Sequence, residues 1–226
     1  MTLHSILSTQ PIIPVVVVDD IPSALQLAQL LMEEDIPIME ITLRRANALK
    51  IIKEIHNNFP TMTIAAGTIR HPEQIASALQ AGAEFCVSPG ISTILLDEAK
   101  RLAVNLLPGV ATASDILLGE PYGLTYYKLF PAVPINGLAL LKAFASPFSD
   151  LKFCPTGGIS QDNYLDYLQQ PNVVAVGCSW FCSSELIANN AWDEIRTRIQ
   201  LLKHEAVGNS VWKNQVNPTL NAPASP

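Results

Sequence analysis

The sequence predicts an α/β protein that folds as a single (β/α)₈ TIM barrel. Three observations support this fold: the chain has 226 residues, 49% of them are hydrophobic, and short β-branched runs alternate with helical patterns. The runs are apolar on both faces, as in parallel strands covered on both sides. A doubly wound open sheet is the structural alternative, but it seldom needs eight such evenly spaced units.

Eight short, β-branched stretches are expected to be the strands. They comprise residues 12–18, 36–43, 62–69, 85–89, 105–110, 126–131, 152–156 and 173–179. Side chains alternate along a strand, so Glu40 and Arg44 share one face of the second stretch, whereas Met39 and Ile41 share the other. The apolar face should pack against helices, which turns Glu40 and Arg44 towards the barrel interior or its lip.

Helical patterns separate the strands. Asp20 and Pro22 mark the start of an apolar repeat over residues 21–32, and Pro72 opens a helix that stops near Gly82. Two later helices are expected, one N-capped by Ser160 and one carrying the series Ile187, Ile195, Ile199 and Leu202 and ending near His204.

Composition indicates one domain and a tail. The barrel is expected over residues 1–205, and residues 206–226, rich in Asn, Pro, Ser and Ala, are expected to be a flexible tail. The net charge of -6 and the pI near 5.1 argue against nucleic acid or an anionic membrane as partner. The chain start lacks a basic signal segment, and no apolar run approaches the ~18 residues of a membrane span.

The cysteines and histidines indicate a cytoplasmic protein without a metal or other cofactor. No Cys-x-x-Cys pair occurs, so small buried thiols in a reducing compartment are expected at Cys86, Cys154, Cys178 and Cys182. The four histidines have no spacing suited to a metal, which counts against a metal-dependent aldolase or hydrolase. The glycine-rich motifs of nucleotide binding do not occur.

Lys128 lies in an otherwise apolar strand, and Glu40 is a lone carboxylate in a similar setting. An ammonium without water favours its neutral amine form, which is a nucleophile towards carbonyl carbon and can form a Schiff base. Barrel layers draw side chains from alternate strands, so we expect Glu40 and Lys128 to approach one another across the interior. A purely structural ion pair is the alternative, but it has no reason to lie at the barrel mouth.

Glycine-bearing turns end the seventh and eighth strands, where this fold usually binds phosphate. Gly157 and Gly158 precede the expected N-cap at Ser160, so backbone N–H groups and a helix start can face an anion there. The turn from Gly177 to Ser179 is expected beside them.

These segments resemble the 2-keto-3-deoxy-6-phosphogluconate (KDPG) aldolase family, whose bacterial members also act as 4-hydroxy-2-oxoglutarate (KHG) aldolases. The matching segments run in order over about residues 10–200. They are Pro-Val-Val-Val-Val at 14–18, Glu-Ile-Thr-Leu-Arg at 40–44, Ala-Gly-Thr at 66–68, Ser-Pro-Gly at 88–90, Leu-Pro-Gly-Val at 107–110, Lys-Leu-Phe-Pro-Ala at 128–132, Phe-Cys-Pro-Thr-Gly-Gly-Ile at 153–159 and Ser-Trp at 179–180.

The resemblance implies a metal-independent class I aldolase, typically a homotrimer, that acts on small 2-keto acids. It implies that Lys128 forms the Schiff base and that Glu40 is the general acid/base. It also implies that the pyruvate part of the substrate is bound by Arg44 and Thr68, and that Pro89 supports them. The aldehyde end of the substrate and its phosphate are then expected to be bound by Thr156, Gly157, Gly158 and Ser179.

Two departures from the family pattern bear on the substrate. Cys178 stands where a second glycine usually precedes Ser-Trp, and residues 133–137 are more apolar than the usual turn. The preferred substrate therefore stays open among KDPG, its galactose-series epimer and 4-hydroxy-2-oxoglutarate. Two other functions also stay open: a phosphosugar isomerase or decarboxylase, and a non-catalytic barrel that binds a phosphorylated metabolite.

Overall fold

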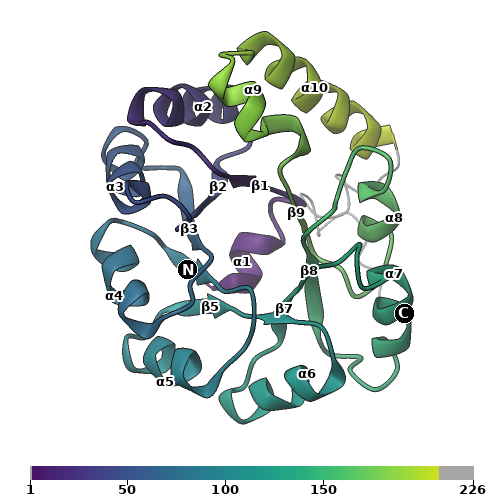
Figure 1. Cartoon of the computed structure of the whole chain (residues 1–226). Helices are drawn as coiled ribbons and strands as arrows, with labels where there is room; N and C mark the ends of the chain where they lie inside the picture. The colour runs from purple at the N-terminus through teal and green to yellow at the C-terminus, as the bar shows by residue number, and fades with distance from the viewer. Residues whose placement is uncertain (1, 209–226) are drawn as a thin grey trace, which may run out of the picture.

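Parallel strands surrounded by helices make up the protein, as Figure 1 shows for a computed structural model that describes residues 2–208. The strands are β1 Ile12–Val16, β2 Ile38–Thr42, β3 Thr63–Gly67, β4 Phe85–Val87, β5 Asn105–Leu107, β6 Gly109–Val110, β7 Tyr126–Leu129, β8 Lys152–Pro155 and β9 Val176–Cys178. They form one six-stranded sheet in the order β5-β4-β3-β2-β1-β9 and one three-stranded sheet in the order β6-β7-β8. The α/β class is thus confirmed.

The strands depart from the expected set of eight in one place. Residues 105–110, expected as one strand, form two, because Pro108 lies between them and has no N–H to donate to a ladder. Strand β5 pairs with β4, whereas β6 pairs with β7. Strands β8 and β9 meet through the isolated bridge between Thr156 and Gly177.

The helices cover the outside of the strands, except for α1 (Figure 1). They are α1 Leu3–Leu7, α2 Ile21–Glu33, α3 Ala48–Asn58, α4 Pro72–Gln80, α5 Thr93–Arg101, α6 Ala113–Gly119, α7 Gly137–Phe144, α8 Tyr164–Leu168, α9 Ser184–Ala188 and α10 Trp192–Gly208, with 3-10 turns η1 Glu120–Tyr122 and η2 Trp180–Cys182. The expected starts of α2 and α4 are confirmed. Asp20 caps α2 by accepting the Ser23 N–H at 2.8 Å, and Pro72 is the first residue of α4. None of the helices within residues 2–208 is long and apolar enough to cross a membrane.

The expected N-cap at Ser160 is wrong. Helix α8 begins at Tyr164, after Asn163, and the Ser160 N–H donates to Asn163 Oδ1 at 3.0 Å. The Asn163 side chain therefore organises a turn between the glycines and the helix, and this turn delays the helix start by several residues.

The expected single last helix is also wrong. Ile187 belongs to α9, and a left-handed Asn190 (φ 53°) separates α9 from α10. Asparagine tolerates this conformation better than most residues, so it can end one helix before another begins. Helix α10 continues through Gly208, so residues 206–208 are helical, not part of a tail. The rest of the expected tail, residues 209–226, lies outside the described residues.

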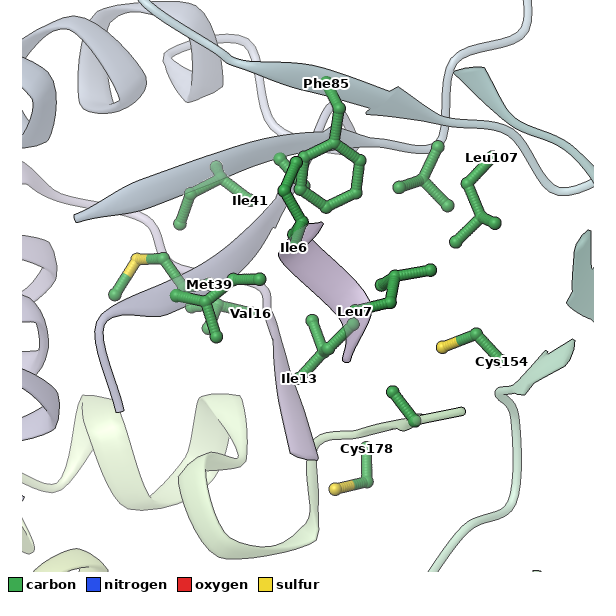
Figure 2. Close-up of a cluster of buried hydrophobic side chains, with 14 of the residues drawn as sticks. Ile6, Leu7, Ile13, Val16, Met39, Ile41, Phe85, Leu107, Cys154 and Cys178 are labelled. Atoms are coloured by element: carbon green, nitrogen blue, oxygen red, sulfur yellow. The ribbon is translucent and has the colours of Figure 1, made fainter. Parts of the chain in front are cut away.

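Helix α1 lies in the middle of the ring of strands (Figure 1). Its side chains Ile6 and Leu7 are 3% and 0% exposed, and Figure 2 shows both within the buried cluster near Ile13. His4 Nδ1 lies 2.6 Å from the hydroxyl of Tyr126, the first residue of β7. Helix α1 therefore covers the amino ends of the strands, whereas the carboxyl ends stay open.

Truncating Leu7 tests this arrangement. Leu7→Ala should lower the free energy of unfolding by ~2–5 kcal/mol, because it leaves a cavity in a fully buried site. Leu201→Ala is the control: Leu201 is 42% exposed on α10, and its truncation should change stability by only ~0.5 kcal/mol. Urea unfolding curves measure both, and equal effects would contradict a core position for α1.

All four cysteines are free and buried, as expected. Burial raises the pKa of the thiols of Cys86, Cys154 and Cys182 from about 9 to about 12, and it raises the pKa of Cys178 well above its usual value. These groups hold their protons more tightly in the folded state than in the unfolded chain. Their contribution to stability is complete below pH 9 and is lost as the pH rises towards 12.

The cysteines should therefore resist alkylation in the folded protein. Iodoacetamide reacts with thiolates, which these buried side chains do not form at pH 8. Intact-mass measurement should find no alkyl group on the native protein and four on the protein unfolded in urea. Rapid alkylation of any cysteine under native conditions would show that its site opens to solvent.

Candidate active site

Lys128 and Glu40 meet inside the strand ring. The Nζ of Lys128 lies 3.4 Å from Oε1 of Glu40, and the two side chains are only 7% and 5% exposed. Glu40 comes from the middle of β2 in the six-stranded sheet, and Lys128 from β7 in the three-stranded sheet. The expectation that they approach one another across the interior is confirmed. Each group offsets the cost of burying the other.

A cavity of about 200 Å³ reaches Lys128. Six of the expected site residues line it: Arg44, Lys128, Thr156, Gly157, Gly158 and Ser179. Val15, Val17 and Ile159 provide much of its apolar wall. A small, partly apolar space with a few polar groups suits a small metabolite.

Arg44 reaches the cavity from a turn. Strand β2 ends at Thr42, so the expected strand alternation does not extend to Arg44; its N–H donates to the Thr42 carbonyl at 2.8 Å. The next residue, Arg45, forms an ion pair with Asp19 at 2.8 Å. Arg44 has no carboxylate partner within residues 2–208, so its guanidinium is available to a carboxylate ligand in the cavity.

Thr68 and Pro89 do not line this cavity, although both follow strands that end on the same side. Thr68 has a φ of 62°, which is rare for a β-branched residue, and such strain is concentrated at functional sites. The strained turn is held because the Ile69 N–H donates to the Val87 carbonyl at 3.0 Å. The carbonyl of Pro89 packs against Gly109. A Cβ built on Gly109 would lie only 2.3 Å from the carbonyl oxygen of Pro89.

Gly157 and Gly158 both have left-handed backbones, with φ values of 96° and 82°. Val133 packs directly on Gly158, since a Cβ there would lie 2.6 Å from the Cβ of Val133. The expected helix start beside these glycines is wrong, because α8 begins only at Tyr164 and has five residues. Neutral groups, namely backbone N–H groups and the Ser179 hydroxyl, are therefore the anion donors that this end of the cavity offers.

Thr156 and Ser179 both line the cavity, and the β-bridge between Thr156 and Gly177 brings the turns after β8 and β9 together, as expected. A Cβ built on Gly177 would lie 2.4 Å from the hydroxyl oxygen of Thr156, so the glycine leaves room for this hydroxyl. The same hydroxyl donates to the Cys154 carbonyl at 3.3 Å. This contact fixes the hydroxyl on the side of the cavity.

Three residues near Lys128 or Glu40 were not among the expected site residues. Phe130 places its ring 5.4 Å from Nζ of Lys128, a distance suited to a cation–π contact. Cys154 is in register with Lys128 on the neighbouring strand, and Gly67 packs against Glu40. Phe130 could have been found from its spacing, because it comes two residues after Lys128 in the stretch that was expected to be a strand. Within residues 2–208, no cluster of His, Cys, Asp and Glu side chains could hold a metal ion.

Comparison with known proteins gives consistent results. The family model for KDPG and KHG aldolase matches residues 3–198. The KHG/KDPG aldolase of Escherichia coli is 40% identical over 204 residues, which cover 90% of this chain and 94% of the relative.

Two solved structures are also similar. The KDPG aldolase of Legionella pneumophila, with pyruvate captured as a covalent carbinolamine, has a TM-score of 0.86 and 38% identity, covering 88% of this chain and 97% of that one. The Zymomonas mobilis 2-keto-3-deoxy-6-phosphogluconate aldolase with 3-phosphoglycerate has a TM-score of 0.79 and 38% identity, covering 86% and 91%. The resemblance noted in the sequence is thus confirmed, and the chain belongs to the KDPG and KHG aldolase family.

Proposed function

We propose that the protein is a Schiff-base-forming class I aldolase. It cleaves 2-keto-3-deoxy-6-phosphogluconate to pyruvate and glyceraldehyde 3-phosphate, and 4-hydroxy-2-oxoglutarate to pyruvate and glyoxylate. The buried contact of Lys128 with Glu40 beside a cavity is the observation that carries this proposal. The KDPG and KHG activities in the name of the Escherichia coli relative support both substrates, and the carbinolamine of the Legionella relative supports a covalent lysine.

The first half of the reaction joins substrate to enzyme. The neutral amine of Lys128 attacks the C2 carbonyl carbon of the 2-keto acid, and the resulting carbinolamine loses water to give an iminium ion. The Glu40 carboxylate, 3.4 Å from Nζ, accepts the proton that the ammonium must release before it can attack. Protonated Glu40 then gives this proton to the carbinolamine hydroxyl, which leaves as water, and Glu40 is a carboxylate again. The iminium then serves as the electron sink.

The second half breaks the C3–C4 bond. Glu40, as the carboxylate, takes the proton of the C4 hydroxyl, the bond electrons move into the iminium, and an enamine forms as the aldehyde leaves. Protonated Glu40 returns a proton to C3 of the enamine. Water then hydrolyses the iminium, which releases pyruvate and restores the ammonium of Lys128 beside the Glu40 carboxylate.

The remaining site residues hold the two ends of the substrate. Arg44 pairs with the C1 carboxylate in a bidentate manner, and Thr68 supports this pyruvate end together with Pro89. Thr156 positions the aldehyde end, whereas the following residues bind its terminal anion: Gly157, Gly158 and Ser179. The 3-phosphoglycerate bound to the Zymomonas relative supports an anion subsite of this kind.

We further infer that the two sheets close into one eight-stranded barrel. The Lys128 N–H donates to the Pro108 carbonyl at 2.9 Å, so β7 also binds the residue that joins β5 to β6. The β8–β9 bridge completes the ring on the other side. This barrel domain extends through α10, which ends at Gly208.

The expected homotrimer and cytoplasmic location stay part of this proposal. Ile94 and Leu117 are 65% and 52% exposed on α5 and α6, and apolar side chains of this size favour contact with another copy of the chain. Free buried cysteines suit a reducing compartment.

Lys128→Ala tests the covalent step. The variant should lose nearly all turnover, because no other lysine within residues 2–208 lines the cavity. Glu40→Gln should lose ~10² to 10⁴ in kcat. Treatment with borohydride and pyruvate should add a stable mass to the natural protein and none to Lys128→Ala. An adduct that persists in Lys128→Ala would refute the assignment.

The same experiment separates the rival functions. A phosphosugar isomerase or decarboxylase would give no pyruvate adduct, and a non-catalytic barrel would bind ligand without forming pyruvate. Values of kcat/KM for KDPG, its galactose-series epimer and 4-hydroxy-2-oxoglutarate then assign the preferred substrate.

Arg44→Lys tests the carboxylate contact. Loss of a bidentate, charge-assisted pair of ~1.5–3 kcal/mol should raise KM for the 2-keto acid about 10- to 150-fold. Arg45→Lys is the matched control, since Arg45 pairs with Asp19 and does not line the cavity. Steady-state kinetics should show little change for the control, and equal KM values in the two variants would remove Arg44 from the site.

A further inference from the structure

The carboxylate of Glu40 occupies the space where Gly67 would carry a side chain. A Cβ built on Gly67 would lie 2.1 Å from Oε1, 2.6 Å from Cγ and 2.7 Å from Cδ of Glu40. Such separations are far inside van der Waals contact. Any residue other than glycine at this position therefore has to displace the Glu40 side chain or move the strand.

The strand register explains the contact. Glu40 on β2 is paired with Ala65 on β3, and Gly67 lies two residues further along β3 on the same face. The Glu40 side chain leans along the sheet towards the open end of the strands, and it comes to rest over Gly67.

The backbone at Gly67 gives no reason for glycine. Its φ lies outside the left-handed region, in contrast to Gly157 and Gly158, so an alanine would adopt the same backbone without strain. The backbone is also held in place: the Gly67 carbonyl accepts the Leu43 N–H at 2.8 Å, and β3 is paired with strands on both sides. The Glu40 side chain is therefore the group that would move.

We propose that Gly67 is a positioning residue for the aldolase reaction. Its missing side chain creates the space that holds the Glu40 carboxylate 3.4 Å from Nζ of Lys128. The inference rests on the proposed role of Glu40 in proton transfer. Gly67 itself touches neither substrate nor Lys128 in this role, and it acts only through Glu40.

Gly67→Ala should therefore impair proton transfer and spare the nucleophile. A displacement of about 1 Å in a catalytic group costs ~10²-fold in rate, so kcat should fall by that factor with KM little changed. Exchange of the methyl protons of pyruvate in deuterated water should fall in parallel, whereas borohydride should still trap pyruvate on Lys128. Gly90→Ala is the matched control, because no atom lies within 4 Å of a Cβ built there.

A second substitution separates positioning from a general structural role. Glu40→Ala removes the three atoms that lie nearest to the new Cβ. In a Glu40→Ala background, Gly67→Ala should therefore cause no further loss of the remaining activity or of stability. If Gly67→Ala alone does not fold, recovery of folding in the double variant supports the inference, and continued failure overturns it.

The outcomes also separate this inference from the proposed function. Normal kcat and normal proton exchange in Gly67→Ala, with a large loss in Glu40→Ala, would overturn the role of Gly67 alone. A further loss from Gly67→Ala in the Glu40→Ala background would do the same. Unchanged activity in Glu40→Ala would instead overturn the proposed role of Glu40.

Discussion

The contact between Lys128 and Glu40 places an amine and a carboxylate in an interior that consists mainly of hydrocarbon side chains. Each group is costly to bury alone, so neither position tolerates loss of the other without a penalty. The two residues come from different sheets, and their distance therefore depends on how both sheets are assembled. The packing of the helices on the strands and the bridge between the ends of β8 and β9 hold the two sheets in place, and this distance with them.

Much of the fold could be predicted because its determinants are local. Apolar runs, Asp20 before α2 and Pro72 at the start of α4 are read directly from neighbouring residues. The predictions of local structure were wrong where a contact with a distant residue, or with a competing side chain, decides the conformation. Asn163 takes over the turn at Ser160, and α1 is too short for periodicity to reveal, although packing makes Leu7 fully buried.

The site was predictable to a similar extent. Strand alternation was enough to bring Glu40 towards Lys128, and the turn glycines indicated the other end of the cavity. Alternation could not place Arg44, since the strand ends before it. The contact of Gly67 with Glu40 depends on how one side chain leans over the next strand, which no spacing along the chain reveals.

The position of α1 at the amino ends of the strands affects the order in which the reaction products leave. Ile6 and Leu7 of α1 are buried at the amino ends of the strands, so in the proposed aldolase both reaction products leave through the cavity that reaches Lys128. In the proposed aldolase the keto-acid fragment is tethered at the deep lysine, and the aldehyde fragment lies nearer the exit. The two products therefore leave in a fixed order, the aldehyde first and pyruvate last. In the reverse, synthetic direction, pyruvate has to bind before the aldehyde.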